Sequence, residues 1–282
     1  MSVEVDSKMK NLDVATVDSF GDEWARFDQS ALSEEEANKI FEEYFAVFPW
    51  ERLPEGATGF DMGCGSGRWA RLMAPRVGHL HCIDPSSALE VAKVALASAN
   101  NASFIHASVD DHPLPENSQD FGYSLGVLHH VPDTAAAISA CVEMIKPGAP
   151  FLVYLYYAFD NRSPLFKFAW QCSDLLRRGI CGLPGPLKHT LTDVLAVTVY
   201  YPLARFSLLA ERMGFGIGSI PLSYYRNHSF YTMRTDSRDR FGTPLEQRFK
   251  RQEIQLMMEG AGLGEVRFSD RAPYWCAVGI KK

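Results

Sequence analysis

A glycine-rich turn in the first quarter of the chain is the stretch best suited to hold a charged small molecule. Residues 59–70 read GFDMGCGSGRWA, so Asp61 precedes a turn that contains Gly63, Gly65 and Gly67. Glycine lets the backbone turn tightly and approach a ligand without a Cβ in the way. The helix that should follow would present free N–H groups and a positive dipole end. The turn therefore predicts a site for a nucleotide-like cofactor.

Two further carboxylates follow strand-like segments. Asp84 ends the run LHCID, and Asp110 ends the run FIHASVD. A carboxylate at the end of a second strand can accept hydrogen bonds from a ribose diol. Asp110 could accept the exocyclic amine of an adenine, with Ile83 and Val109 as flat apolar walls. Taken alone, Asp110 is typical of a solvated turn and Asp61 of a turn former; their order with Asp84 favours the binding interpretation.

The same residues permit a second interpretation. The segment GSGRWA fits the G-x-G-x-x-A dinucleotide fingerprint, and Asp84 lies at about the distance expected for a ribose-binding acid. An NAD(P)-dependent oxidoreductase is therefore an alternative, although it would need a hydride-handling site that the sequence does not display. A non-catalytic cofactor-binding subunit is a third possibility, which only activity would exclude.

The order of the motifs resembles one family. A fourth apolar run leads into LGVLHHVPD at 125–133, and IKPGA follows at 145–149. Together with the earlier motifs, these resemble the class I S-adenosylmethionine-dependent methyltransferases of the group often called type 11, over roughly residues 55–157 and again near 250. The resemblance implies S-adenosyl-L-methionine as cofactor, a small or medium-sized methyl acceptor, and a Rossmann-like sheet. It implies that the cofactor is bound by Asp61, Gly63, Cys64, Gly65, Gly67, Asp84, Pro85, Val109, Asp110 and Leu125.

His129 and His130 follow the fourth predicted strand, where an acceptor would approach. A histidine titrates near neutral pH and could take a proton from a hydroxyl or an amine. We place His129 first as the candidate catalytic base and His130 second, because a histidine at the corresponding point acts as a base in some relatives. The alternative is that both shape the turn. Tyr44, Tyr156 and the aromatic residues at 20–27 could close over the cofactor, but core packing is the stronger expectation.

Alternating strand and helix signals position these motifs. Strands are expected near 57–62, 79–84, 102–107, 120–126 and 151–156, separated by helices. This alternation indicates an α/β fold with a mostly parallel, doubly wound sheet and helices on both faces. The resemblance adds a closing hairpin, 265–269 with 275–280, to give seven strands. The predicted organisation is an N-terminal helical cap (1–50), a cofactor-binding core (51–157), a helical insertion or acceptor lid (158–248), and a C-terminal helix and hairpin (249–282).

Within the N-terminal cap, residues 1–16 are expected to be loose. Ser33 should cap the next helix, and Glu36 should complete a capping box. Further along, the charge-dense residues 234–241 are predicted to form a solvated loop rather than an anion clamp.

The insertion after the fifth strand has its own character. It contains an apolar helical stretch, 187–213, which Pro202 is expected to interrupt. Residues 163–215 carry six Lys or Arg and three Asp or Glu, so the segment is net +3 in a chain of net charge −6. This contrast permits contact with a membrane surface or an anionic acceptor, whereas packing of its own core or a dimer interface is equally compatible. Its aromatic residues suggest an apolar or aromatic acceptor: Phe166, Phe168, Trp170, Tyr200 and Tyr201.

Composition limits the remaining classes. Without a long basic run, a general nucleic-acid binder is not expected. The six cysteines lack C-x-x-C or metal-ligand spacing, which predicts reduced thiols, no metal site and a cytoplasmic protein. Residues 1–11 are polar and acidic, unlike a signal or transit sequence, and no run of about 18 apolar residues is evident for spanning a bilayer. The oligomeric state stays open.

Overall fold

A seven-stranded sheet forms the centre of the molecule. The computed structural model describes residues 11–282 except 112, 161 and 219. The strand order is β3-β2-β1-β4-β5-β7-β6; β1 to β5 are parallel, and β7 pairs antiparallel with both β5 and β6. The predicted fold class and closing hairpin are therefore confirmed. The strands are β1 (Thr58–Met62), β2 (His79–Ile83), β3 (Ala102–Ile105), β4 (Phe121–Leu125), β5 (Pro150–Tyr154), β6 (Leu263–Phe268) and β7 (Cys276–Lys281).

Helices cover both faces of this sheet, which explains why the adjacent strands β4 and β5 are apolar almost throughout. On one face, α5 (Thr134–Met144) and α10 (Arg251–Gly260) pack against Phe60, Phe151 and Val153. On the other face, α2 (Glu34–Tyr44), α3 (Ala70–Met73) and α4 (Ala88–Ala95) pack against Phe121, Tyr123 and Leu152. The strand order reverses between β1 and β4, and ligands in such sheets bind beyond the carboxyl ends of the strands at this point.

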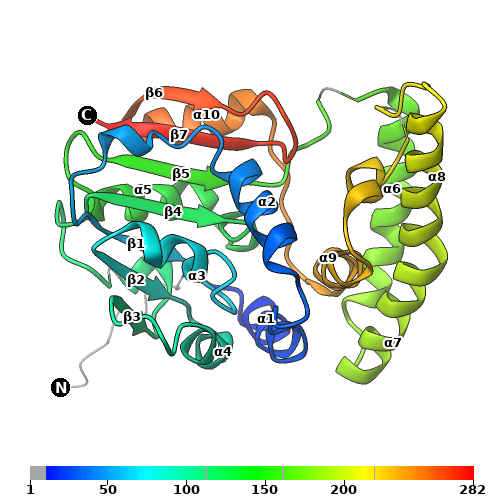
Figure 1. Ribbon diagram of the computed structural model, residues 1–282, viewed down its shortest axis with the longest axis horizontal. Helices are drawn as coiled ribbons and strands as arrows, with labels where there is room; N and C mark the ends of the chain where they lie inside the picture. Colours follow the sequence, from blue (N-terminus) through cyan, green and yellow to red (C-terminus); the bar gives the residue numbers. More distant parts are fainter. Residues whose placement is uncertain (1–10, 112, 161, 219) are drawn as a thin grey trace, which may run out of the picture.

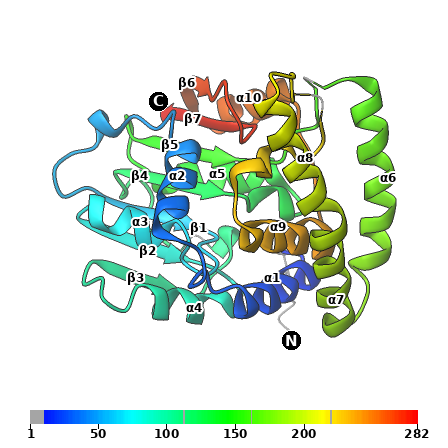
Figure 2. The ribbon, with the colours of Figure 1, turned by 45° about the vertical axis from the view of Figure 1, so that its right-hand side comes forward.

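A second group of helices stands beyond those strand ends. Figure 1 shows α1 (Val14–Arg26) and α9 (Phe230–Gly242) beside the sheet, with α6 (Pro164–Ile180), α7 (Gly185–Leu195) and α8 (Tyr201–Arg212) as the layer farthest from it. Figure 2 shows the same order from a second direction, with α9 between the sheet and α8. The insertion thus builds a helical wall that faces the carboxyl ends of the strands.

The outer wall differs from the expectation for 187–213. Pro202 does not interrupt the helix, because it lies in the first turn of α8 directly after a π-helical turn, Ala196–Tyr200. In a π-helical turn the backbone hydrogen bonds span five residues instead of four, so the regular α-helical pattern is already broken before the proline. Residues Gly185–Arg212 therefore form one helix. By length and composition alone, it could cross a membrane, so the expectation that no such stretch exists is wrong.

The expectation of a solvated loop at 234–241 is also wrong, because these residues belong to α9. Their charges are largely paired inside the protein: Arg238 is fully buried, and its guanidinium donates to Asp22 Oδ2 (3.0 Å) and to Ser19 Oγ (3.3 Å) of α1. Glu23 Oε2 lies 4.0 Å from Arg238 Nη1. The charge density therefore reflects a buried contact between α9 and α1.

The N-terminal expectations are partly correct. Ser33 Oγ caps α2 by accepting from Glu36 N (3.2 Å). The Glu36 carboxylate does not complete the capping box, because it accepts from Ser229 N and Thr232 Oγ1 (2.8 Å each) at the start of α9. Asp13 caps α1, so residues 11–16 are not loose; residues 1–10 lie outside the described part of the chain.

Candidate active site

The glycine-rich turn is fixed to the end of β2. Gly63 N and Cys64 N both donate to the carbonyl of Ile83 (2.8 and 3.0 Å), and Gly65 N donates to Asp84 Oδ2 (2.8 Å). Gly63 has a φ of +77°, and a Cβ there would lie 2.4 Å from Val127 Cγ1. Only glycine therefore permits this close passage of the backbone.

Asp84 organises the turn while keeping room for a ligand. Its Oδ1 accepts from Ser86 N (2.8 Å) and Ser86 Oγ (2.6 Å). Burial raises the pKa of Asp84, and the bonds from Ser86 and Gly65 oppose that rise. Because a carboxylate oxygen has two lone pairs, Oδ2 can still accept one hydrogen bond from a ligand hydroxyl.

A cavity of about 620 Å³ extends from this turn to the helical wall. Seven of the ten predicted cofactor residues line it: Gly63, Cys64, Gly65, Asp84, Pro85, Val109 and Leu125. Gly67, Asp61 and Asp110 are not among its lining residues. Asp110 instead accepts from Asn11 N (2.8 Å) and Ser108 Oγ (2.6 Å). The Asp61 carboxylate is fully buried, and burial raises its pKa to about 8, a rise that the neighbouring Tyr123 hydroxyl opposes.

Aromatic side chains close the cofactor end of the cavity. Phe20 and Trp24 reach it from α1, Tyr44 from α2, and Trp69 follows the turn. A Cβ on Gly65 would lie 3.0 Å from the indole nitrogen of Trp24, so Trp24 stands directly against the turn. The space between glycine backbone, aromatic rings and the Asp84 carboxylate fits an adenosine-type group. Core packing was the stronger expectation for Tyr44, Tyr156 and the aromatic residues at 20–27, yet Phe20, Trp24, Tyr44 and Tyr156 line the cavity.

The two candidate histidines lie in different environments. His129 is fully buried outside the cavity lining, its ring centroid 3.9 Å from that of Tyr156, and burial lowers its pKa well below the usual value. His130 lines the cavity, and burial lowers its pKa to about 4. Its Nδ1 lies 2.6 Å from the carbonyl oxygen of Leu245. Because that oxygen can only accept, Nδ1 carries the proton and Nε2 is left with a lone pair.

Asp239 of α9 faces His130 across the cavity. Its Oδ1 lies 3.9 Å from His130 Nε2, and neither atom has a hydrogen-bond partner among the described residues. The hydroxyl of Tyr156 donates to the other oxygen, Oδ2. Burial raises the pKa of Asp239 to about 6. Asp239 is not recognisable as a site residue from the sequence, because its only signal there, a dense run of charges, is shared with ordinary solvated loops.

The far end of the cavity is an aromatic wall. Phe159, Phe166 and Trp170 line it, and the guanidinium of Arg248 lies 4.9 Å from the Phe159 ring centroid and 5.1 Å from that of Trp170. Of the five predicted acceptor aromatics, Phe166, Trp170 and Tyr200 line the cavity. Phe168 and Tyr201 are exposed on the other side of the helices.

Comparison with known proteins identifies the family. A profile described as "Methyltransferase domain" matches residues 60–153. The Ubiquinone biosynthesis O-methyltransferase of Hahella chejuensis is 30% identical over 171 residues, which cover 57% of this chain and 68% of that protein. The protein of the same name from Saccharophagus degradans is 36% identical over 110 residues, covering 37% of this chain and 44% of its own.

The chain spans about half the length of most of these curated relatives. Among solved structures, a chain of the complex that contains the Haloferax volcanii Trm112 methyltransferase activator is similar, with a TM-score of 0.51 and 16% identity, covering 93% of this chain and 97% of that one. This similarity supports the fold. The sequence matches favour the methyltransferase interpretation of the glycine turn over the nicotinamide one, and the protein belongs to the class I S-adenosylmethionine-dependent methyltransferases.

Proposed function

We propose that the protein methylates a hydroxyl group on an apolar or aromatic small molecule. The observation that carries this proposal is the pair of unpartnered proton acceptors, His130 Nε2 and Asp239 Oδ1, 3.9 Å apart in the cavity that begins at the glycine turn. The name of its relatives, Ubiquinone biosynthesis O-methyltransferase, supports a small acceptor bearing a hydroxyl.

The cofactor end of the cavity supplies binding and orientation. Asp84 would accept a hydrogen bond from a ribose hydroxyl, the backbone of Gly63 and Gly65 would lie against the amino-acid portion, and Trp24 would cover it. S-adenosylmethionine, when bound, supplies a methyl group already activated by a sulfonium. The remaining task of the protein is therefore alignment and removal of a proton.

The acceptor end supplies the apolar surface. Phe166 and Trp170 offer large flat contact areas, which suit an aromatic or apolar molecule. Arg248 lies over the rings of Phe159 and Trp170. It is held there because its Nε donates to Glu246 Oε1 (2.8 Å), and Glu246 is further fixed by Arg240 (2.9 Å). An apolar acceptor bound in this space would exclude water, which would strengthen the polar contacts at the reacting atom.

The proton would pass to Asp239. With a pKa of about 6, this carboxylate is ionised at neutral pH and is a stronger base than His130, whose pKa is about 4. A hydroxyl placed between them has one proton and would donate it to Asp239 Oδ1, while the neutral imidazole of His130 would limit the position of the hydroxyl by contact alone. Tyr156 fixes the carboxylate by donating to Oδ2. His129 would act only indirectly, by packing against the Tyr156 ring.

The test has two stages. Calorimetry should show selective binding of S-adenosylmethionine and its demethylated product; binding of NAD alone would contradict the proposal. With a phenolic acceptor that is turned over, Asp239→Asn should lower kcat by about 10² or more with little change in cofactor affinity, and His130→Asn should lower it to a smaller extent. His79→Asn, on β2 and outside the cavity lining, is the matched control.

Two results would overturn the assignment. Near-normal turnover by folded Asp239→Asn would exclude this carboxylate as the base. Cofactor binding without turnover of any hydroxyl acceptor would instead support the non-catalytic subunit.

A further inference from the structure

The outer surface of the helical wall is apolar over an unusual length. Within residues 186–209, all of which the structure describes, every exposed side chain is uncharged. Eight of them are large and apolar: Leu187, Leu191, Val194, Val197, Val199, Tyr201, Phe206 and Leu209. At 1.5 Å per residue, the row from Leu187 to Leu209 extends over about 33 Å. Monomeric soluble proteins rarely expose an apolar patch of this extent without a partner.

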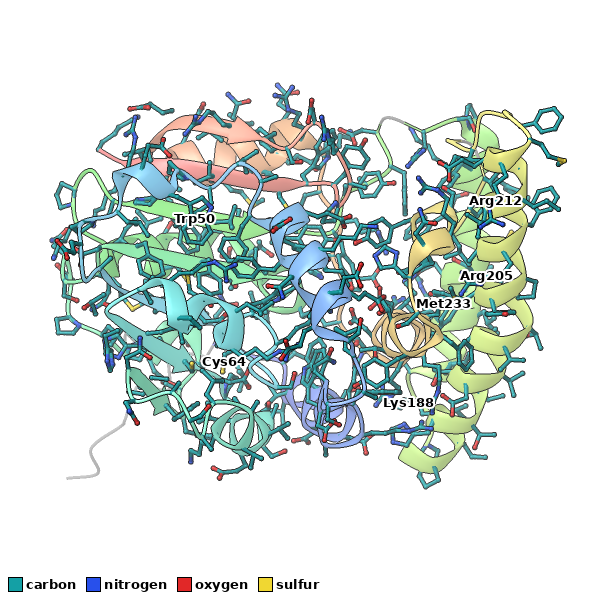
Figure 3. All side chains as sticks on the ribbon, in the orientation of Figure 1. Trp50, Cys64, Lys188, Arg205, Arg212 and Met233 are labelled. Carbon is teal, nitrogen blue, oxygen red and sulfur yellow. The ribbon has the colours of Figure 1, made fainter. Side chains whose placement is uncertain are left out.

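The charged residues within 186–209 turn inward. Lys188 is buried and donates from Nζ to the carbonyl of Gly242 (3.3 Å), and Figure 3 shows it on the side of α7 that faces α9. Asp193 pairs with Arg26 and Arg234, and Arg205 donates to the carbonyl of Arg226 (2.8 Å). One face of the helix is thus packed against the protein, which argues against a helix that crosses a bilayer.

Helix α6 extends the apolar surface beside α7 and α8. Its Phe168, Leu175 and Leu176 are exposed as well. Exposed charges lie near the ends: the side chain of Arg178 is 70% exposed, and Arg212 is exposed at the end of α8, as Figure 3 shows. The neighbouring Glu211 is exposed too, and its carboxylate pairs with Arg226 (2.8 Å). An apolar face flanked by exposed arginines is complementary to an anionic lipid surface.

Two elements of this wall carry residues that both line the cavity and are open to solvent. They are Ala169 of α6 and Val199 of the π-helical turn. On their inner side, the same elements present Phe166, Trp170 and Tyr200 to the cavity. Lipid in contact with these exposed residues would lie next to the cavity, so an apolar molecule could pass from one to the other, whereas a partner protein would cover them.

We propose that the outer face of α6, α7 and α8 docks the protein onto the surface of an anionic lipid bilayer. The face rests on the interface with its apolar side chains among the acyl chains, and the exposed Ala169 and Val199 face the lipid. The docking proposal depends only on the properties of this outer face. The further step, in which an apolar acceptor enters from the lipid, also depends on the proposed function.

The experiment is sedimentation of the full chain with vesicles. Vesicles of phosphatidylcholine with phosphatidylglycerol should bind the protein, pure phosphatidylcholine vesicles should bind it more weakly, and added salt should reduce the difference. The double variant V194E/F206E should lose at least about tenfold in vesicle partition, because both charges would enter the acyl region. The control V94E/L256E changes apolar residues on α4 and α10 that are at least as exposed, and it should bind as the parent does.

The outcomes separate the competing explanations. Absence of binding to either vesicle, or equal loss in both double variants, would overturn docking. A stable dimer of the parent by light scattering that V194E/F206E dissociates, without vesicle binding, would assign the face to a second copy instead. S-adenosylmethionine calorimetry on the same variants reports the proposed function separately, since neither variant touches the cofactor end.

Discussion

Asp84 illustrates how one side chain serves both the turn and the ligand. Its carboxylate holds Gly65 and Ser86 and retains one free acceptor position. Asp84→Ala should therefore lower S-adenosylmethionine affinity at least about tenfold, through the lost ribose bond and the loosened turn. Calorimetry on the folded variant measures this, with Asp270→Ala, whose side chain is 93% exposed, as control. Unchanged affinity would show that the end of β2 does not bind the cofactor.

The raised pKa of Asp239 makes a prediction for the dependence of activity on pH. Burial raises this pKa to about 6, so the carboxylate is protonated, and unable to accept a proton, below that pH. We expect kcat to fall about tenfold per pH unit below about pH 6 and to level off above it. His130 stays neutral down to about pH 4 and should not contribute to this limb. A flat profile between pH 5 and 7, measured within the range where the protein stays folded, would argue against Asp239.

At the scale of elements, α1 and α9 depend on each other. Arg238 joins them through Ser19 and Asp22, and the Arg238 side chain is fully buried. Burial raises the pKa of Glu23 well above its usual value, the nearby Asp239 adds to this rise, and Arg238 opposes it. Removing Arg238 would leave these acidic groups without their cation and open a void.

We therefore expect Arg238→Ala to lower the free energy of unfolding by about 3–5 kcal/mol. Arg52→Ala, which breaks the exposed pair with Glu265 (2.7 Å), should cost less than about 1 kcal/mol. Urea unfolding of both variants provides the comparison. Equal, small losses would mean that the buried network contributes little to the joining of the two helices.

The same network shows where sequence reasoning reaches its limit. The glycine turn and Asp84 were predictable because their contacts connect neighbouring strands, and local patterns set those strands. Asp239 and Arg238 were not, because the residues that bury them, such as Ser19 and His130, lie about a hundred or more positions away. A run of alternating charges has the same appearance whether water or a distant helix surrounds it. Likewise, the capping box failed because Ser229 competes for Glu36.

At the scale of the whole molecule, the protein has two layers with the cavity between them. The sheet carries the cofactor end and the helical wall carries the acceptor end, while α1 and α9 connect them. The predicted succession of strands and helices along the chain was sufficient to identify the first layer. The second layer could be recognised as helical and apolar, but which of its faces turned inward was decided by packing against α9, which the sequence pattern alone did not reveal.

Because of this division, a different tryptophan lies at each end of the cavity, so tryptophan fluorescence can report binding at each end. Trp24 stands against Gly65 at one end of the cavity, and Trp170 belongs to the aromatic wall at the other. Addition of the cofactor should therefore change the tryptophan fluorescence, and Trp24→Phe should diminish this change while Trp170→Phe leaves it largely intact. Addition of an aromatic acceptor should also change the fluorescence, and this second change should be diminished by Trp170→Phe and left largely intact by Trp24→Phe. The order in which the two signals develop in rapid mixing would then reveal which molecule must arrive before the other.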